Sequence, residues 1–162
     1  MNLSLIASAE IFNKEECQYL VNLYKKNIHL CGKWQGTYPL SLVYLKNEDN
    51  ILVKNIAEKL CNIASEIYQN KLTVEVVEIV RWPKYSRKDC HKDTNRDTTV
   101  LASITYLNSN YAGGRTIFEN NLKIEPIIGK TIFFDGRNIE HSVEEVFDGE
   151  RYTLAIWYKI VS

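Results

Sequence analysis

The sequence lacks an excess of charge of either sign. Its 162 residues include 20 Lys and Arg against 20 Asp and Glu, so the formal net charge is zero. A balanced charge gives no electrostatic reason to expect a nucleic acid or an anionic membrane as the main partner. No stretch approaches the roughly 18 apolar residues of a membrane span, and no basic start with a long apolar run marks a signal peptide. We therefore expect a cytoplasmic protein with neither kind of partner.

Closely spaced cysteine pairs are also missing. The four cysteines are Cys17, Cys31, Cys61 and Cys90, and no two of them form a CxxC pair. This spacing argues against a structural zinc site, which usually needs such pairs. Cys17 and Cys61 fall on apolar helical stripes, where a cysteine acts as a small buried hydrophobe. We expect four free thiols in a reducing compartment.

The chain shows no internal repeat and no linker rich in proline or glycine; it holds only 3 Pro and 7 Gly. Its length suits one domain with a sizeable core. We therefore expect a single domain over residues 1–162, with a helical part at about 1–70 and a barrel core at about 72–160. The oligomeric state is not indicated by the sequence.

The first part carries two helical patterns. Asn13 and Glu16 fit a capping box at the start of the first helix, which continues with an i, i+3, i+4, i+7 stripe. The second helix is expected at about 50–68, with Asp49 or Asn50 as its cap. The apolar stripe of the second helix is predicted to be Leu52, Ile56, Leu60, Ile63 and Ile67.

The second part changes to the period of β-strands. The predicted strands are Leu72 to Trp82, Thr98 to Leu107, Thr131 to Asp135, Ile139 to Phe147 and Arg151 to Ile160. In the last of them, two alternating sets should face opposite sides of a sheet: Tyr152, Leu154, Ile156 and Tyr158 against Arg151, Thr153, Ala155 and Trp157. Many short strands after a helical part predict an α+β fold: a double-stranded β-helix, or jelly-roll/cupin-like barrel, with the N-terminal helices packed outside.

A candidate metal site lies in the strand-rich part. His91 and Asp93 form an HxD triplet, and residues two apart in an extended segment point the same way. Of the three histidines in the chain, His141 alone lies in the later strands and can supply a third ligand. Two imidazoles and one carboxylate form the facial triad of non-haem iron(II) oxygenases, which leaves open positions on the metal.

Arg151 lies ten residues after His141, at the start of the last predicted strand. An arginine inside an apolar barrel is costly unless it is paired, and a bound dicarboxylate would supply the partner. The planar fork of its guanidinium suits a carboxylate. The alternative is that Arg151 faces solvent beside Glu150 at the strand end.

Several further motifs occur in a fixed order, and together with the triad they resemble the prolyl 4-hydroxylase-like branch of the 2-oxoglutarate/iron(II) oxygenases. The resemblance is firm from about residue 78 to 158. The matching segments are Arg96 to Leu101 leading to Tyr106-Leu107-Asn108, Gly113-Gly114-Arg115-Thr116-Ile117-Phe118, Pro126 with Gly129, Phe133 and Phe134, His141-Ser142-Val143 through Val146, Gly149-Glu150-Arg151-Tyr152, and Trp157.

The resemblance implies a role for individual residues. His91, Asp93 and His141 would bind iron(II), and Arg151 would pair with the distal carboxylate of the co-substrate 2-oxoglutarate. Thr116 would add a hydrogen bond to that carboxylate, and Tyr106 would line the same pocket. The implied reaction consumes dioxygen and releases succinate and CO2, and the resemblance also suggests ascorbate as an accessory reductant.

The chain departs from the family pattern ahead of the HxD triplet. The family usually has a tyrosine about nine residues before the histidine and a glycine three residues after that tyrosine. These positions hold Trp82 and Tyr85 here. The expected apolar walls of the site are Ile104, Phe118, Phe133 and Trp157.

The function implied by the resemblance is hydroxylation of a prolyl residue in a peptide or protein. One alternative is a hydroxylase of a free amino acid or another small molecule, and a strongly closed pocket would favour it. A second is a catalytically silent barrel that binds a ligand. A third is nucleic-acid demethylation, but its R-x5-R pattern would need an arginine where Trp157 stands.

Overall fold

Antiparallel sheets and two α-helices make up the residues that the computed structural model describes, 6–44 and 48–162. The helices are α1 (Lys14–Lys26) and α2 (Glu48–Tyr68). The strands are β1 (Ile6–Glu10), β2 (Tyr38–Ser41), β3 (Leu72–Trp82), β4 (Lys88–His91), β5 (Thr99–Tyr106), β6 (Ala112–Gly113), β7 (Thr116–Phe118), β8 (Leu122–Ile124), β9 (Lys130–Phe134), β10 (His141–Val143), β11 (Val146–Asp148) and β12 (Arg151–Ile160).

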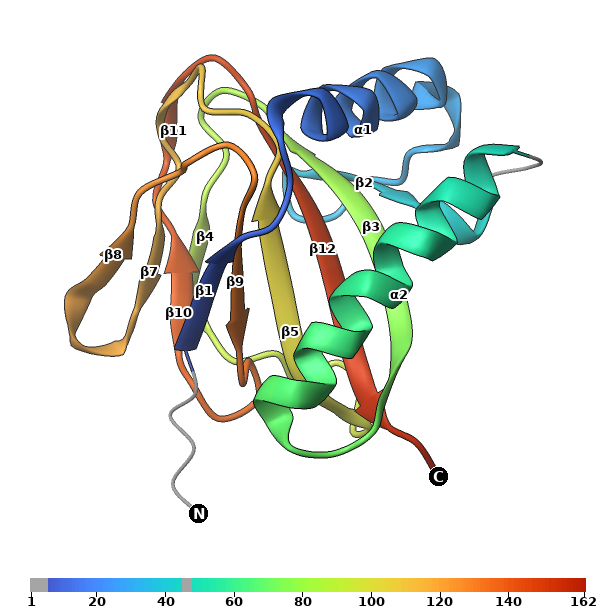
Figure 1. Cartoon of the computed structure of the whole chain (residues 1–162). Helices are drawn as coiled ribbons and strands as arrows, with labels where there is room; N and C mark the ends of the chain where they lie inside the picture. The colour runs from blue at the N-terminus through green and yellow to red at the C-terminus, as the bar shows by residue number, and fades with distance from the viewer. Residues whose placement is uncertain (1–5, 45–47) are drawn as a thin grey trace.

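The strands form two layers. A six-stranded sheet has the order β1-β9-β5-β12-β3-β2, and a four-stranded sheet has the order β4-β10-β7-β8. A short third sheet pairs β11 with β6. Figure 1 shows both helices over one face of the larger sheet, with the four-stranded sheet toward its other face. This is the arrangement expected of a jelly roll with helices packed outside.

β12 runs through the middle of the larger sheet and confirms the predicted alternation. Tyr152, Leu154, Ile156 and Tyr158 belong to the hydrophobic core that the helices cover. The other set lines a cavity between the two sheets: Arg151, Thr153, Ala155 and Trp157. One strand therefore stabilises the fold with one face and supplies the wall of a cavity with the other.

The first helix begins as predicted. The Asn13 side chain accepts a hydrogen bond from the Glu16 backbone N–H at 2.8 Å, and the Glu16 carboxylate accepts one from the Asn13 N–H at 3.2 Å. The predicted cap of the second helix is wrong, because α2 begins at Glu48 and both Asp49 and Asn50 lie inside its first turn.

Most of the predicted stripe of α2 packs on the core, but Leu52 does not. Leu52 is 39% exposed, while Val53 is buried beside Ala57, Leu60 and Cys61. All four cysteines are free, as expected, and burial raises the pKa of the Cys61 thiol. Neither described helix is long and apolar enough to cross a membrane.

The sequence analysis did not predict the short strands β4, β6, β7 and β8, and its strand assignment needs two further corrections. The segment from Ile139 to Phe147 is not one strand: β10 pairs with β4 and β7, whereas β11 pairs with β6. The chain changes sheets at Glu144, whose N–H donates to the Arg115 carbonyl. The N-terminal part also holds two strands that join the larger sheet, β1 beside β9 and β2 beside β3.

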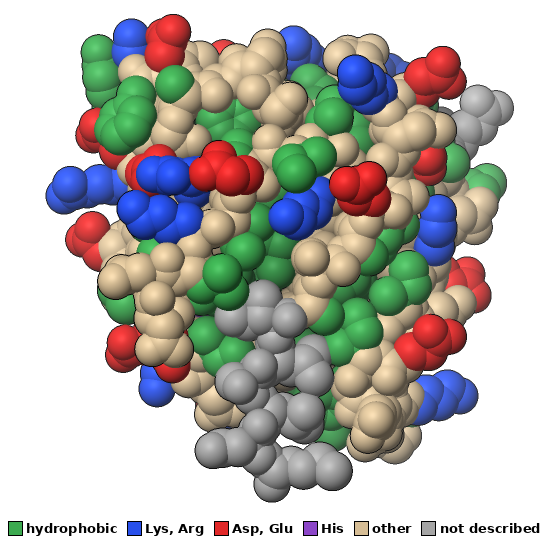
Figure 2. All heavy atoms as spheres, turned by 60° about the vertical axis from the view of Figure 1, so that its left-hand side comes forward, with side chains coloured by type: hydrophobic (Ala, Val, Ile, Leu, Met, Phe, Trp, Pro, Cys, Tyr) green, Lys and Arg blue, Asp and Glu red, His purple; other side chains and the backbone are tan. Residues whose placement is uncertain are grey.

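Charged side chains of both signs are interspersed on the face that Figure 2 shows. This distribution agrees with the zero net charge of the chain. A continuous basic surface, the usual footprint of a nucleic-acid-binding protein, is not seen on this face.

The capping box gives a first test of the fold. Asn13→Ala should lower the free energy of unfolding by about 1 kcal/mol, because it leaves a helix N–H without its acceptor. Urea denaturation followed by circular dichroism measures the loss. Asn13→Ser restores an acceptor and should recover most of it; equal stability of the wild type and Asn13→Ala would contradict the role of the cap.

Candidate active site

The three predicted ligands lie together at one end of the cavity. His91 is paired with His141 across strands β4 and β10, and Asp93 follows two residues after His91. The Nε2 atoms of His91 and His141 lie 3.5 and 3.3 Å from Asp93 Oδ1. One ligand atom from each residue lies within 4.8 Å of the other two. The set fits a divalent metal that accepts two nitrogens and an oxygen on one face.

Backbone carbonyls orient both imidazole rings. His91 Nδ1 lies 2.7 Å from the Asp89 carbonyl oxygen, and His141 Nδ1 lies 3.0 Å from the Ile139 carbonyl oxygen. A carbonyl oxygen only accepts, so each Nδ1 donates its proton. With Nδ1 turned to a carbonyl oxygen, Nε2 is the ring nitrogen that faces Asp93 and the one that is available to a metal.

Asp93 is held by its neighbours on three sides. Its backbone N–H donates to the Gly136 carbonyl at 2.7 Å, and Trp157 Nε1–H donates to Oδ2 at 3.3 Å. Burial raises the pKa of the Asp93 carboxyl, but hydrogen bonds from His141 and His91 outweigh burial and hold that pKa well below its ordinary value. The carboxyl is therefore ionised at neutral pH, the form that a metal would bind.

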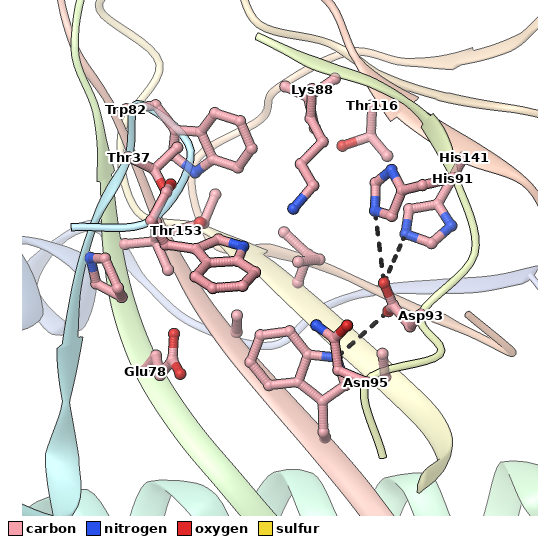
Figure 3. Close-up of a pocket in the computed structure, with 18 of the residues that line it drawn as sticks. Thr37, Glu78, Trp82, Lys88, His91, Asp93, Asn95, Thr116, His141 and Thr153 are labelled. Atoms are coloured by element: carbon pink, nitrogen blue, oxygen red, sulfur yellow. Dashed lines mark hydrogen bonds and ion pairs between the residues drawn. The ribbon is translucent and has the colours of Figure 1, made fainter. Parts of the chain in front are cut away.

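The cavity has a volume of about 520 Å³ and lies between the two sheets. Its polar wall includes the triad, Thr116 and Arg151, and its apolar wall includes Ile104 and Trp157, as predicted. Phe133 and Phe118 are wrong predictions. Phe133 faces the helix-covered core, Phe118 packs behind Phe134, and Phe134 lines the cavity instead. Figure 3 shows the three ligands on one side of this space and Trp82 across from them.

Arg151 is buried without a carboxylate partner. Its side chain is 1% exposed, and its Nε and Nη1 atoms have no hydrogen-bond acceptor among the described residues. Nη2 donates to the Thr116 hydroxyl at 3.3 Å, and the guanidinium carbon lies 4.6 Å from the Trp82 ring centroid. Glu150 pairs instead with Arg81, at 2.7 Å, so the solvent-exposed alternative for Arg151 is wrong.

The surroundings of Arg151 are suited to binding an anion. The Trp82 Nε1–H and the Tyr111 hydroxyl are also buried without hydrogen-bond partners among the described residues. A buried N–H or O–H that donates to nothing is costly, and a bound carboxylate can accept from several donors at once. The residues present therefore fit the distal carboxylate of 2-oxoglutarate.

Thr116 lines the cavity, as predicted, but Tyr106 lies behind it. Tyr106 is fully buried and is not among the residues that line the cavity. Its hydroxyl oxygen lies 2.7 Å from the Thr116 hydroxyl oxygen. Tyr106 therefore orients Thr116 and contributes a ring 5.5 Å from the Arg151 guanidinium carbon.

Four charged residues that line the cavity were missed by the sequence analysis: Lys33, Glu78, Lys88 and Arg96, of which Lys33 and Arg96 are exposed. Lys88 is three residues before His91, an odd spacing that would place the two on opposite faces of a regular strand. In β4, however, Lys88 pairs with Val143 and His91 with His141, so β4 carries one extra residue opposite β10. This bulge brings both side chains into the cavity, where Figure 3 shows the Lys88 amine pointing inward.

Tyr85, which stands where the family usually has glycine, keeps the backbone conformation that glycine favours. Its φ is +72°, in the left-handed region. Its N–H donates to the Val146 carbonyl at 2.8 Å, and Val146 N–H donates to the Ser86 carbonyl at 2.9 Å. These two bonds hold the turn despite the steric cost of a side chain at positive φ.

Sequence comparison identifies the family. The profile of the 2OG-Fe(II) oxygenase superfamily matches residues 77–159, which is more than half of the chain and includes all three candidate ligands and Arg151. No curated protein gives a sequence match. A jelly roll that carries two histidines and a carboxylate in a cavity defines a class of metal-dependent enzyme. The chain belongs to the 2OG-Fe(II) oxygenase superfamily.

Solved structures of prolyl hydroxylases share the fold. A viral collagen prolyl hydroxylase from Paramecium bursaria Chlorella virus-1, in complex with 2OG, has a TM-score of 0.76 at 20% identity, covering 97% of this chain and 96% of that one. A Pseudomonas putida prolyl-4-hydroxylase has a TM-score of 0.78 at 14% identity, covering 97% and 93%.

A third structure is a Trichoplax adhaerens prolyl hydroxylase in complex with a peptide fragment of the hypoxia inducible factor oxygen degradation domain. Its TM-score is 0.80 at 19% identity, covering 98% of this chain and 85% of that one. These likenesses confirm the predicted α+β double-stranded β-helix. Membership of the superfamily makes the chain an oxygenase that depends on iron(II), 2-oxoglutarate and dioxygen.

Gly136 offers a test of the site in which no candidate ligand is itself substituted. A Cβ atom at this position would lie 2.4 Å from Asp93 Oδ2, so Gly136→Ala should displace the carboxylate. We expect metal affinity to fall by about tenfold or more, measured by calorimetric titration with Mn(II). Gly32→Ala is the matched control, because its Cβ would be no closer than 3.9 Å to any atom. Equal affinity in the two variants would contradict the role of Gly136.

Proposed function

We propose that residues 1–162 form one oxygenase domain in which His91, Asp93 and His141 hold iron(II) and Arg151 anchors 2-oxoglutarate, and that the enzyme hydroxylates a prolyl residue in a peptide or protein. The observation that carries the proposal is the buried guanidinium of Arg151, which lies in the same cavity as the triad. Its Nε and Nη1 atoms have no hydrogen-bond acceptor among the described residues. With dioxygen, the bound iron and 2-oxoglutarate would supply the oxidising chemistry and leave succinate and CO2 as co-products.

The residues of the chain would bind the co-substrate, orient it toward the triad and shield the site from water. Arg151 and Thr116 would fix one end of the co-substrate, so that its other end is directed toward the triad. The apolar wall formed by Ile104, Phe134 and Trp157 would keep water away from the reacting atoms. The carbonyls at Asp89 and Ile139 would hold the two imidazoles in the metal-binding tautomer.

The prolyl substrate is supported by the fold of the relatives and by the mouth of the cavity. Three similar structures are prolyl hydroxylases, and one of them is in complex with a peptide. The cavity is rimmed by exposed side chains, including Trp34, Asn95 and Arg96. An open rim can accept an extended chain, whereas a free amino acid would favour a closed pocket.

Turnover without a target substrate tests the oxygenase. The wild type, supplied with iron(II) and 2-oxoglutarate, should form succinate, and a proline-rich peptide should raise the rate. His141→Ala should abolish succinate formation because it removes one of three ligands. The measurement is succinate by mass spectrometry. Stimulation by free proline but not by peptide would identify a small molecule as the substrate. An inactive wild type that fails to bind 2-oxoglutarate would support the alternative of a catalytically silent barrel.

Arg151 can be tested separately from the metal. Arg151→Gln should raise the KM for 2-oxoglutarate by about 30-fold or more, which corresponds to the roughly 2 kcal/mol lower limit for truncating a buried charge pair. Metal affinity should be unaffected. Arg151→Lys retains the charge and should recover part of the loss. A KM that does not change in Arg151→Gln would rule out the anchoring role.

A further inference from the structure

The cavity has three corners, and the proposed function uses two of them. Arg151 and Trp82 mark the first corner, since they are paired across β12 and β3. The triad marks the second, where Phe134 of β9 packs edge-on against His141 at 4.8 Å between ring centroids. Glu78 marks the third, on β3 between β12 and β2. Figure 3 shows Glu78 across the cavity from the three candidate ligands.

The co-substrate does not reach the third corner. Glu78 is four residues from Trp82 along β3, or about 13 Å of strand. It is also three strand spacings from β9, or about 14 Å, because the order is β9-β5-β12-β3. A five-carbon dicarboxylate that runs between Arg151 and the triad leaves Glu78 uncovered. This corner is therefore open to the primary substrate.

Glu78 is a carboxylate without a contact partner in this corner. It is half-buried and lines the cavity, and no described residue donates a hydrogen bond to it or pairs with it within 4 Å. Burial raises the pKa of its carboxyl, and the more distant Arg96 lowers it. Asp93 and Glu78 are the only carboxylates among the described residues that line the cavity. Since Asp93 is one of the three candidate metal ligands, Glu78 is the carboxylate that is available to a cationic group of the substrate.

The other charges of the cavity would orient a cationic group. Lys88 and Arg151 stand at the co-substrate side and would repel it, while Lys33 and Arg96 also line the cavity but are exposed to solvent, which screens their charge. Exposed Trp34 lines the same cavity and offers an aromatic face to the aliphatic stem of a long basic side chain. The separation between Glu78 and the triad is too wide for an amine on the hydroxylated ring itself. It suits a basic side chain on a neighbouring residue.

We propose that Glu78 is a specificity-determining residue that receives a lysyl or arginyl side chain flanking the target residue of a peptide substrate. The proposal rests on the proposed function, because it takes the triad as the place of reaction. It adds that the enzyme selects peptides by positive charge next to the hydroxylated position.

The test takes the ratio of kcat/KM for two peptides on the same variant. A change in the fraction of folded enzyme affects both values equally and does not change this ratio. The probes are heptapeptides with proline at the centre, in which lysine, norleucine or glutamate is placed at one flanking position at a time. The wild type should prefer the lysine peptide over the norleucine peptide by about tenfold in kcat/KM at one of these positions. Glu78→Gln should reduce this ratio to within about twofold, and Glu78→Lys should favour the glutamate peptide. Hydroxylated product is measured by mass spectrometry.

Glu66→Gln is the matched control, since Glu66 is exposed on α2, away from the cavity. It should keep the wild-type preference. A lysine preference that persists in Glu78→Gln, or its absence in the wild type, would overturn the proposal while leaving the oxygenase intact. An enzyme that hydroxylates free amino acids but no peptide would also overturn the proposal and leave the oxygenase intact. A wild type without uncoupled succinate formation would instead remove the proposed function, and this inference with it.

Discussion

Burial of the Arg151 guanidinium is the constraint on which the site depends. A charge withdrawn from water must be compensated locally, and the chain supplies only part of the compensation. Trp82 and Tyr106 place ring faces near the guanidinium, and Thr116 accepts one hydrogen bond. Gly114 leaves room for the side chain, because a Cβ there would lie 3.1 Å from Arg151 Cδ. Nε and Nη1 have no acceptor among the described residues, and a bound carboxylate could accept from both.

The alternation of β12 joins this constraint to the stability of the fold. Leu154, Ile156 and Tyr158 anchor the sheet to the helix-covered core, while the residues between them reach the cavity. Trp157, near the far end of the strand, donates to Asp93. The proposed co-substrate anchor and a support of a candidate metal ligand are thus carried by one central strand. Its two neighbours, β3 and β5, hold it in register along most of its length.

The sequence predicted those features that depend on short-range pattern. The bounds of β3 follow from its run of β-branched residues, those of β12 from its alternating pattern, and the start of α1 from its capping box. The HxD triplet with His141 was sufficient to predict the candidate ligands, which the structure brings together. Phe133 was misassigned because β9 is buried on both faces, so its apolar run does not indicate which side faces the cavity.

Features set by pairing between distant segments could not be predicted. The β4 bulge exists only relative to β10, so nothing near Lys88 in the sequence indicates that its amine enters the cavity. The break between β10 and β11 reflects a change of pairing partner rather than a turn motif. Glu78 looks like any polar residue in an alternating strand until β12 and β2 enclose it.

The distribution of charge in the cavity separates two kinds of recognition. The basic groups Arg151 and Lys88 suit the carboxylates of a co-substrate common to the superfamily. Glu78 has no role in that binding, and a half-buried carboxylate without a partner is a cost that core packing would remove more simply with an apolar residue. A cation brought by the substrate offsets this cost only when the substrate is bound. A carboxylate such as Glu78 adds little to the stability of the free enzyme, but it allows the enzyme to distinguish one substrate from another.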